Sequence, residues 1–156
     1  MSNPRWKIRP EGSTWGDFGP DDQIGRMNLL TPERRLGGVR EVRDGLAFTL
    51  SLPLDYPGGN VLLEQRREPR FIHERRGPGH NFNFNLSNVC DCFSDVVSDD
   101  AVVLYTQYST QWDALAHVGQ MFDADGDGMV EKVYYNGYQG GREIRGPDDG
   151  EGPYGA

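Results

Sequence analysis

The sequence is poor in the groups that build disulfide-rich or zinc-rich proteins, with two cysteines and three histidines in 156 residues. Cys90 and Cys92 are too close and too few to form a disulfide framework. A Cys-x-Cys pair supplies only half of a zinc site, and the chain has no second pair. We therefore expect both thiols to be reduced, as is usual in the cytoplasm.

Long apolar runs are absent as well. No run reaches the roughly 18 residues that a membrane-spanning helix needs. The first residues, MSNPRWKIRPEG, contain no apolar stretch like that of a secretory signal. These two observations predict a cytoplasmic protein with no membrane partner.

The chain has fewer positive than negative residues: 16 Lys and Arg against 24 Asp and Glu, which gives a net charge of −8. Such a chain repels nucleic acid and anionic membranes, so we expect neither as a partner. The basic stretch 63–80 contains interspersed Glu, and we interpret it as a solvated loop. Its histidines, His73 and His80, are weak candidate ligands.

Hydrophobic residues make up 36% of the chain, which is low for a self-contained globule. Part of the apolar surface therefore needs a partner. We expect a homo-oligomer or association with a missing half of the protein. The 21 Gly and 10 Pro indicate many turns and few long helices in a single domain with a modest core.

Local patterns predict several elements along the chain. Residues 1–14 are polar with two prolines and predict an extended arm, and the tail 139–156 is Gly-, Asp- and Pro-rich and predicts a loop. Thr31-Pro32 predicts a helix start, with Gly45 as the candidate for its end. Alternating or apolar stretches predict strands at Ala47–Leu54, Asn81–Leu86 and Val130–Tyr138.

The stretch Val102–Gly119, VVLYTQYSTQWDALAHVG, begins as a buried strand and then turns polar without Gly or Pro. An extended chain would place four polar side chains on one face: Gln107, Ser109, Gln111 and Asp113. A buried polar row needs partners, a ligand or a metal. Asp113 and His117 would share a face if a helix begins near Asp113. This stretch therefore predicts a site.

The sequence DADGDG matches the first half of a calcium loop, with Asp123, Asp125 and Asp127 at positions 1, 3 and 5. Position 12 is Tyr134 in place of the bidentate Glu, and no amphipathic helix flanks the loop. A tight acidic hairpin turn between Phe122 and Val130 explains the same residues, and we prefer it to a calcium loop that binds tightly.

The stretch around Asp113 resembles the signature H-x-G-T-H-x-D-x-P-x-H of the cyclase/kynurenine-formamidase family of metal-dependent hydrolases. Three residues match that pattern: Thr110, Asp113 and His117. Gln107 and Gln111 stand where the family usually has metal-binding histidines, Ser109 replaces the glycine, and Leu115 replaces the proline. The form Q-x-S-T-Q-W-D-x-x-x-H, with the stretch Trp15–Arg35, resembles a divergent branch of the family.

The resemblance implies a mixed α/β fold, called swivelling β/β/α, in which helices flank a barrel-like mixed sheet. Family members are about twice as long, so the chain resembles the amino-terminal half of one. The resemblance also implies metal-assisted hydrolysis of an amide, lactam or ester, as in arylformamidases of tryptophan catabolism to kynurenine. His117 would be the catalytic acid/base.

The resemblance also implies a metal held by Gln107, Gln111 and Asp113. A set of oxygen ligands suits manganese, magnesium or calcium better than zinc. Alternatively, the glutamines hydrogen-bond each other and the protein is a metal-free small-molecule binding protein without a cofactor. A third possibility is a fragment that assembles with a second polypeptide.

The resemblance further suggests substrate contacts from three aromatic residues: Trp15, Phe18 and Trp112. For Trp15 and Phe18 the alternative, which we favour, is that they only pin the arm to the core, since most aromatic side chains are packing residues.

Overall fold

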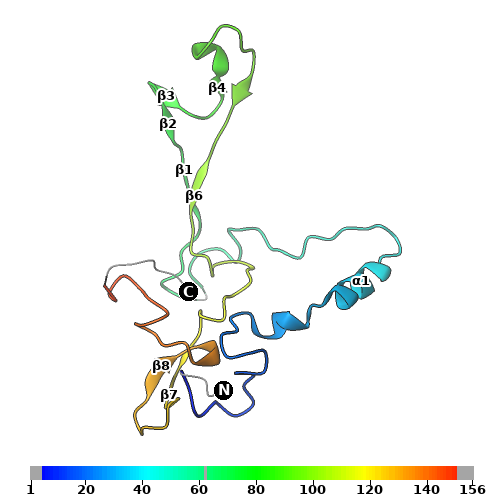
Figure 1. Ribbon diagram of the computed structural model, residues 1–156. Coiled ribbons are helices and arrows are strands. Elements are labelled where there is room, and N and C mark those ends of the chain that lie inside the picture. Colours follow the sequence, from blue (N-terminus) through cyan, green and yellow to red (C-terminus); the bar gives the residue numbers. More distant parts are fainter. Residues whose placement is uncertain (1–4, 62, 151–156) are drawn as a thin grey trace. The chain divides into compact units, whose positions relative to one another are not determined.

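The computed structural model describes residues 5–61 and 63–150. The chain forms two compact units (Figure 1). Unit 1 comprises the chain up to Ala47 and from Asp113 onward, and unit 2 is Phe48–Trp112. Each unit is considered by itself. The sequence prediction of a single domain concerns both units together and stays a prediction.

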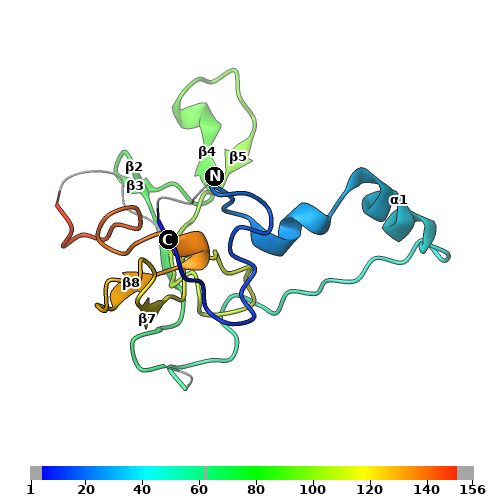
Figure 2. The same cartoon turned by 60° about the horizontal axis from the view of Figure 1, so that its bottom comes forward.

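Unit 1 contains the 3-10 helix η1 (Gly25–Leu29), helix α1 (Pro32–Arg40), strands β7 (Gln120–Phe122) and β8 (Glu131–Val133), and the 3-10 helix η3 (Tyr135–Gly137). The two strands pair antiparallel, with Gln120 opposite Val133 and Phe122 opposite Glu131. In both views η3 lies beside this hairpin (Figures 1 and 2).

Helix α1 begins where the sequence predicts it. The Thr31 side chain accepts a hydrogen bond from the Arg34 amide, and Pro32 occupies the first helical position. The helix ends at Arg40 with Glu41 as its C-cap, so the prediction of Gly45 as the end is wrong. Two consecutive glycines at 37–38 lower helix propensity, and no residue of α1 is buried, so nothing stabilises a longer helix.

The core of unit 1 is small and aromatic. Trp15, Ala124 and Val133 are buried, with Trp6 and Phe122 packed against them. The Trp15 ring contacts Phe122 edge-on at 6.2 Å and lies 5.9 Å from the Trp6 ring. The described part of the amino-terminal arm is held here, because the amides of residues 7 and 8 both donate to the Ala124 carbonyl. The arm therefore packs on the β7–β8 hairpin.

Asn136 ties distant parts of unit 1 together. It is fully buried and adopts a positive φ of 57°, a conformation that Asn tolerates better than most residues. Its Nδ2 donates to the carbonyls of Gly19, Pro20 and Asp22 at 3.0–3.1 Å. Its Oδ1 accepts from the Gly16 amide at 2.9 Å. One side chain thereby fixes the loop 16–22, more than a hundred residues earlier.

Unit 2 consists of short antiparallel strand pairs: β1 (Arg70–Ile72) with β6 (Ala101–Val103), β2 (Arg75–Arg76) with β3 (Gly79–His80), and β4 (Phe84–Asn85) with β5 (Val96–Val97). The 3-10 helix η2 (Leu86–Asn88) follows β4. The buried Tyr108 donates its hydroxyl hydrogen to the Gly59 carbonyl at 2.6 Å and anchors the loop that precedes β1.

The predicted strands are shorter than the sequence patterns suggest. Of Asn81–Leu86 only Phe84–Asn85 is strand, of Val130–Tyr138 only Glu131–Val133, and the strand expected from Val102 ends at Val103. Ala47–Leu54 forms no strand. A period of two marks a side-chain pattern, but a strand also needs a backbone neighbour, and these stretches lack one beyond a few residues.

The described residues form four separate two-stranded sheets and few helices. The fold is therefore one of small mixed elements, and no barrel-like closed sheet is present in this part of the chain. Cys90 and Cys92 are joined in a disulfide, so the prediction of reduced thiols is wrong. No helix among residues 5–61 and 63–150 has the length and apolarity to cross a bilayer. Residues 139–150 form turns with two isolated bridges, and the rest of the predicted tail lies outside the described residues.

Candidate functional site

The segment Asp113–His117 forms a turn in unit 1, so the prediction of a helix there is wrong. The His117 amide donates to the Ala114 carbonyl at 2.9 Å, and β7 begins at Gln120, which leaves no room for a second helical turn. Gly119 lies between them, where a Cβ would approach the Val133 carbonyl to 2.6 Å. The close approach of this segment to β8 therefore favours a turn.

The turn nevertheless brings the predicted acid and imidazole together. Asp113 Oδ1 lies 3.1 Å from His117 Nδ1, and the two side chains are 47% and 23% exposed. The distance is that of an ion pair, while the direction of the ring nitrogen does not meet hydrogen-bond geometry. A carboxylate beside Nδ1 favours a proton on that nitrogen, which leaves Nε2 as the basic atom. An imidazole beside a carboxylate is a pairing that general acid/base catalysis uses.

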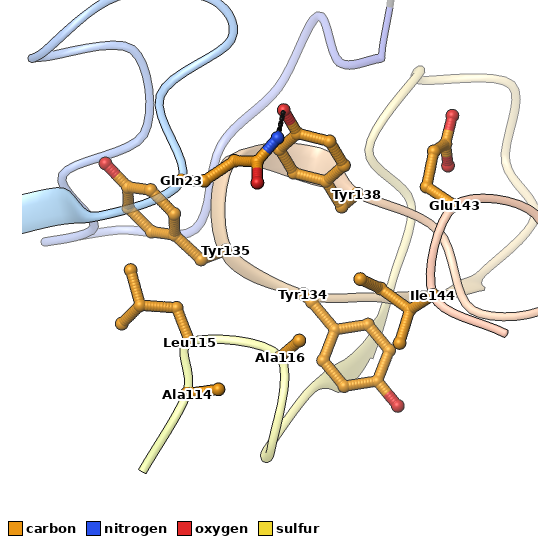
Figure 3. Close-up of a pocket in the computed structure, with 9 residues that line it drawn as sticks. All are labelled: Gln23, Ala114, Leu115, Ala116, Tyr134, Tyr135, Tyr138, Glu143 and Ile144. Carbon is orange, nitrogen blue, oxygen red and sulfur yellow. Dashed lines mark hydrogen bonds between the residues drawn. The ribbon is translucent and has the colours of Figure 1, made fainter. Parts of the chain in front are cut away.

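A cavity of about 290 Å³ opens directly beside this turn. Figure 3 shows its wall, in which the turn residues face two groups of side chains. One group follows β8 directly, and the other comes from the loop further toward the carboxy terminus. The lining residues are Gln23, Ala114, Leu115, Ala116, Tyr134, Tyr135, Tyr138, Glu143 and Ile144. Aromatic and aliphatic walls with a few polar groups are typical of small-molecule sites.

One side of the cavity is braced by a carboxylate network. Tyr135 donates its hydroxyl hydrogen to Asp22 Oδ2 at 2.8 Å, and Asp22 also accepts from the Gly25 amide and from Asn28. Burial raises the pKa of Asp22, but the hydrogen bonds from Asn28, Tyr135 and Gly25 outweigh it and hold that pKa below its usual value. Burial, the hydrogen bond to Asp22 and its charge raise the pKa of Tyr135 to about 12.

The opposite side is braced through Tyr138. Gln23 Nε2 donates to the Tyr138 hydroxyl oxygen at 3.2 Å, as Figure 3 shows, and that hydroxyl donates to the Asp21 carbonyl. The Arg5 guanidinium lies 4.2 Å from the centre of the Tyr138 ring, within the range of a cation–π contact. The tyrosine walls are therefore held by residues from the amino-terminal region, and the cavity is largely formed before any ligand enters.

The other predicted ligands belong to unit 2. Gln107 is half-buried, and its backbone carbonyl accepts a hydrogen bond from Arg66 Nη1 at 2.8 Å. Gln111 is exposed, and Trp112 is 93% exposed. The ligand set Gln107, Gln111 and Asp113 is thus divided between the two units, and its assembly into one metal site stays a prediction.

The polar row predicted around these glutamines does not form an extended strand. Ser109 Oγ donates to the Pro53 carbonyl at 2.7 Å, and Thr110 Oγ1 accepts from the Leu52 amide at 3.1 Å. These two side chains therefore fasten one loop of unit 2 to another. Trp15 lies in the core of unit 1, which agrees with the packing alternative, and Phe18 is half-buried. The substrate contacts of Trp15, Phe18 and Trp112 stay predictions.

The turn between β7 and β8 gathers the acidic residues of the DADGDG sequence. Asp123, Asp125, Asp127 and Glu131 place ligand oxygens within 4.8 Å of one another, so this cluster could hold a metal ion. Asp123 also accepts hydrogen bonds from the amides of Gly126, Asp127 and Gly128. The predicted acidic hairpin turn is confirmed, and its carboxylates already stabilise the turn backbone.

Sequence reasoning missed the tyrosine-lined cavity and the fourth acid, Glu131. The signal for the cavity was the run Tyr134-Tyr-Asn-Gly-Tyr138, which alternation assigned to a strand. An Asn-Gly pair is a turn sequence, and here it forms the last two residues of η3, soon after β8 ends at Val133. Glu131 occupies position 9 of the calcium-loop pattern. The sequence prediction considered a carboxylate only at position 12 and therefore missed Glu131.

Comparison with known proteins bears on the class of this fold. No family model matches the sequence, and no curated protein does. Among solved structures, the chain is similar to a crystal structure described as a novel cyclase, with 31% sequence identity and a TM-score of 0.57. The match covers 81% of this chain and 37% of that chain. The likeness supports the cyclase family that the signature around Asp113 suggests, and the chain spans well under half of that cyclase's length.

Proposed function

We propose that this chain is the amino-terminal half of a cyclase-family hydrolase that cleaves an amide, lactam or ester with the help of a divalent metal. The observation that carries the proposal is the 31% identity to a cyclase over 81% of this chain. The Asp113–His117 pair beside a cavity supports it, since an imidazole near a small-molecule cavity suits proton transfer at neutral pH.

In this proposal His117 moves the proton. It takes a proton from the attacking water and returns it to the leaving nitrogen or oxygen, while the Asp113 carboxylate, 3.1 Å from Nδ1, stabilises the charge that forms on the ring. A carboxylate can face an imidazole through one oxygen and a metal through the other, so both roles of Asp113 are compatible. The cavity beside the turn would receive the substrate, and its tyrosine and aliphatic walls suit an arylformamide of the kind degraded in tryptophan catabolism.

The donor chemistry of Gln107, Gln111 and Asp113 fits a hard cation. Two amide carbonyls and one carboxylate are oxygen ligands, which suit manganese or magnesium better than zinc. A metal bound there would polarise the substrate carbonyl and lower the pKa of a water. The acidic cluster of the β7–β8 turn offers oxygen ligands as well, so metal analysis must separate the two.

The experiment that tests this function is metal analysis of the full-length protein that contains this half, together with hydrolysis of N-formylkynurenine, an isatin-type lactam and an aryl ester, with added manganese or zinc. We expect bound divalent metal and hydrolysis that a chelator abolishes. Metal that persists in Asp123→Asn but falls in Asp113→Asn would assign it to the predicted site. A protein with neither metal nor hydrolysis would refute the proposal.

A second candidate is a metal-free small-molecule binding protein on the same fold. The observation that favours it is the presence of Gln107 and Gln111 where the family signature has histidines. Calorimetric binding of an arylformamide or aryl carboxylate without added metal, and without turnover, would favour this candidate over the hydrolase.

A further inference from the structure

The stretch Phe48–Leu54 in unit 2 has the side-chain pattern of a strand. Its apolar residues alternate with Thr49, Ser51 and Pro53. Phe48, Leu50 and Leu52 are 78%, 90% and 52% exposed. The structure leaves the stretch as an extended coil, coloured cyan in Figure 1. Within the described part of unit 2, nothing covers this amphipathic strand pattern.

The backbone of this stretch is open as well. Among the described residues, the amides and carbonyls of Phe48–Ser51 make no hydrogen bond. The stretch is fastened only at its end, where Leu52 binds Thr110 and Pro53 binds Ser109. Pro53 lacks an amide hydrogen and cannot donate to a strand ladder. Phe48–Ser51 thus presents both an unpaired edge and an apolar face.

Such a surface needs two kinds of cover. Burying a large apolar side chain is favourable, so several exposed in one row mark an interaction surface. The open edge needs a neighbouring strand. The same stretch of a second copy would supply only the neighbour, because the resulting two-stranded ribbon would still expose its apolar face. A partner must therefore bring a strand together with an apolar layer.

The comparison with the cyclase indicates what that partner is. The matched region is 37% of the cyclase chain, so most of that fold has no counterpart among these 156 residues. We propose that Phe48–Leu54 is a strand-docking site, and that its occupant is a β-strand from the part of the cyclase fold that this chain lacks. The inference rests on the fold likeness and is independent of hydrolysis.

Hydrogen exchange tests the proposal. The probe is the unmatched part of the similar cyclase, prepared as a separate polypeptide and mixed with the full 156-residue chain. In the chain alone, the amides of Phe48–Ser51 should exchange at the rate of unstructured peptide. In the mixture a complex should form, and these amides should exchange at least about tenfold more slowly, because they enter a strand ladder.

Two aspartate substitutions on neighbouring residues test the face. Leu50→Asp should weaken the complex at least about tenfold, because it places a charge on the covered apolar face. Thr49→Asp, on the opposite face of the same stretch, should leave the affinity within about threefold. Both residues lie in an open coil, so circular dichroism of the isolated variants should match the wild type.

Four outcomes would overturn the proposal. They are the absence of a complex, a complex in which Phe48–Ser51 stays unprotected, equal loss of affinity in the two variants, and protection already present in the chain alone. Protection in the monomer would show that the chain covers its own stretch, and protection that rises with protein concentration would show that a second copy does. Failure of the hydrolase proposal would leave all these exchange rates unchanged.

Discussion

At the residue scale, His117 and Asp113 carry the proposed chemistry, since they lie 3.1 Å apart and flank the turn residues 114–116, which line the cavity. In protein that hydrolyses an arylformamide, His117→Ala should lower kcat on the order of 100-fold, the usual scale for a general acid/base, and spare the metal content. Asp113→Asn should lower metal content and activity together. His73→Ala, an exposed histidine of unit 2, should leave both unchanged. Full activity in His117→Ala would contradict the assignment.

Asn136 is the residue on which unit 1 depends most. Asn136→Asp replaces the donor that serves three carbonyls with an oxygen that repels them, so it should lower the free energy of unfolding by on the order of 3 kcal/mol. The matched control is Asn83→Asp, at an exposed asparagine that also has a positive φ. This control should change the free energy of unfolding by less than about 0.5 kcal/mol. Urea denaturation measures both, and equal effects would show that the network contributes nothing.

The raised pKa of Tyr135 makes stability depend on alkaline pH. The folded state holds the phenol proton up to about 12, whereas the unfolded chain releases it near 10, so the stabilisation is complete below pH 10 and is lost as the pH rises to 12. The stability difference between wild type and Tyr135→Phe should shrink across this range in urea denaturation. Tyr56→Phe, an exposed tyrosine of unit 2, serves as the control. A difference that stays constant from pH 9 to 12 would refute the prediction.

At the element scale, the elements with local causes were predictable. A capping threonine and a proline start α1, and a run of Asp and Gly turns β7 into β8, because both causes lie within a few residues of their effect. Spacing also anticipated that Asp113 and His117 meet, although a turn rather than a helix brings them together.

Elements with distant causes were not predictable. Alternation proposed a strand at Ala47–Leu54, but alternation carries no information on whether a neighbouring strand exists. The cavity depends on contacts such as Tyr135 with Asp22 and Tyr138 with Gln23, each between residues more than a hundred positions apart. No local pattern encodes such a contact, so the tyrosines were assigned to a strand.

The β7–β8 turn should bind calcium weakly. Position 12 is Tyr134, so the bidentate carboxylate of a tight loop is missing, and Asp123 already accepts three backbone hydrogen bonds. Calorimetric titration at micromolar protein should show no strong event. A sub-micromolar site that disappears in Asp123→Asn would instead establish a calcium loop.

At the scale of the whole molecule, substitutions of the predicted metal ligands test whether residues of the two units form one metal site. Gln107→His with Gln111→His should raise zinc affinity at least about tenfold if the three signature residues form one site, because it supplies the two imidazoles of the family signature. The control is Gln65→His with Gln120→His, which adds the same groups at exposed positions elsewhere. Zinc titration against a chromophoric chelator measures both. Equal affinities would show that the signature residues of the two units do not form one site.

The network centred on Asn136 also sets an order of events during synthesis. Unit 1 is discontinuous, and its loop 16–22 has to wait for a side chain that the ribosome adds more than a hundred residues later. All of unit 2 is therefore translated before unit 1 can close. While unit 2 is being synthesised, the nascent amino-terminal segment therefore lacks the residues that cover its tryptophans and hold its loop.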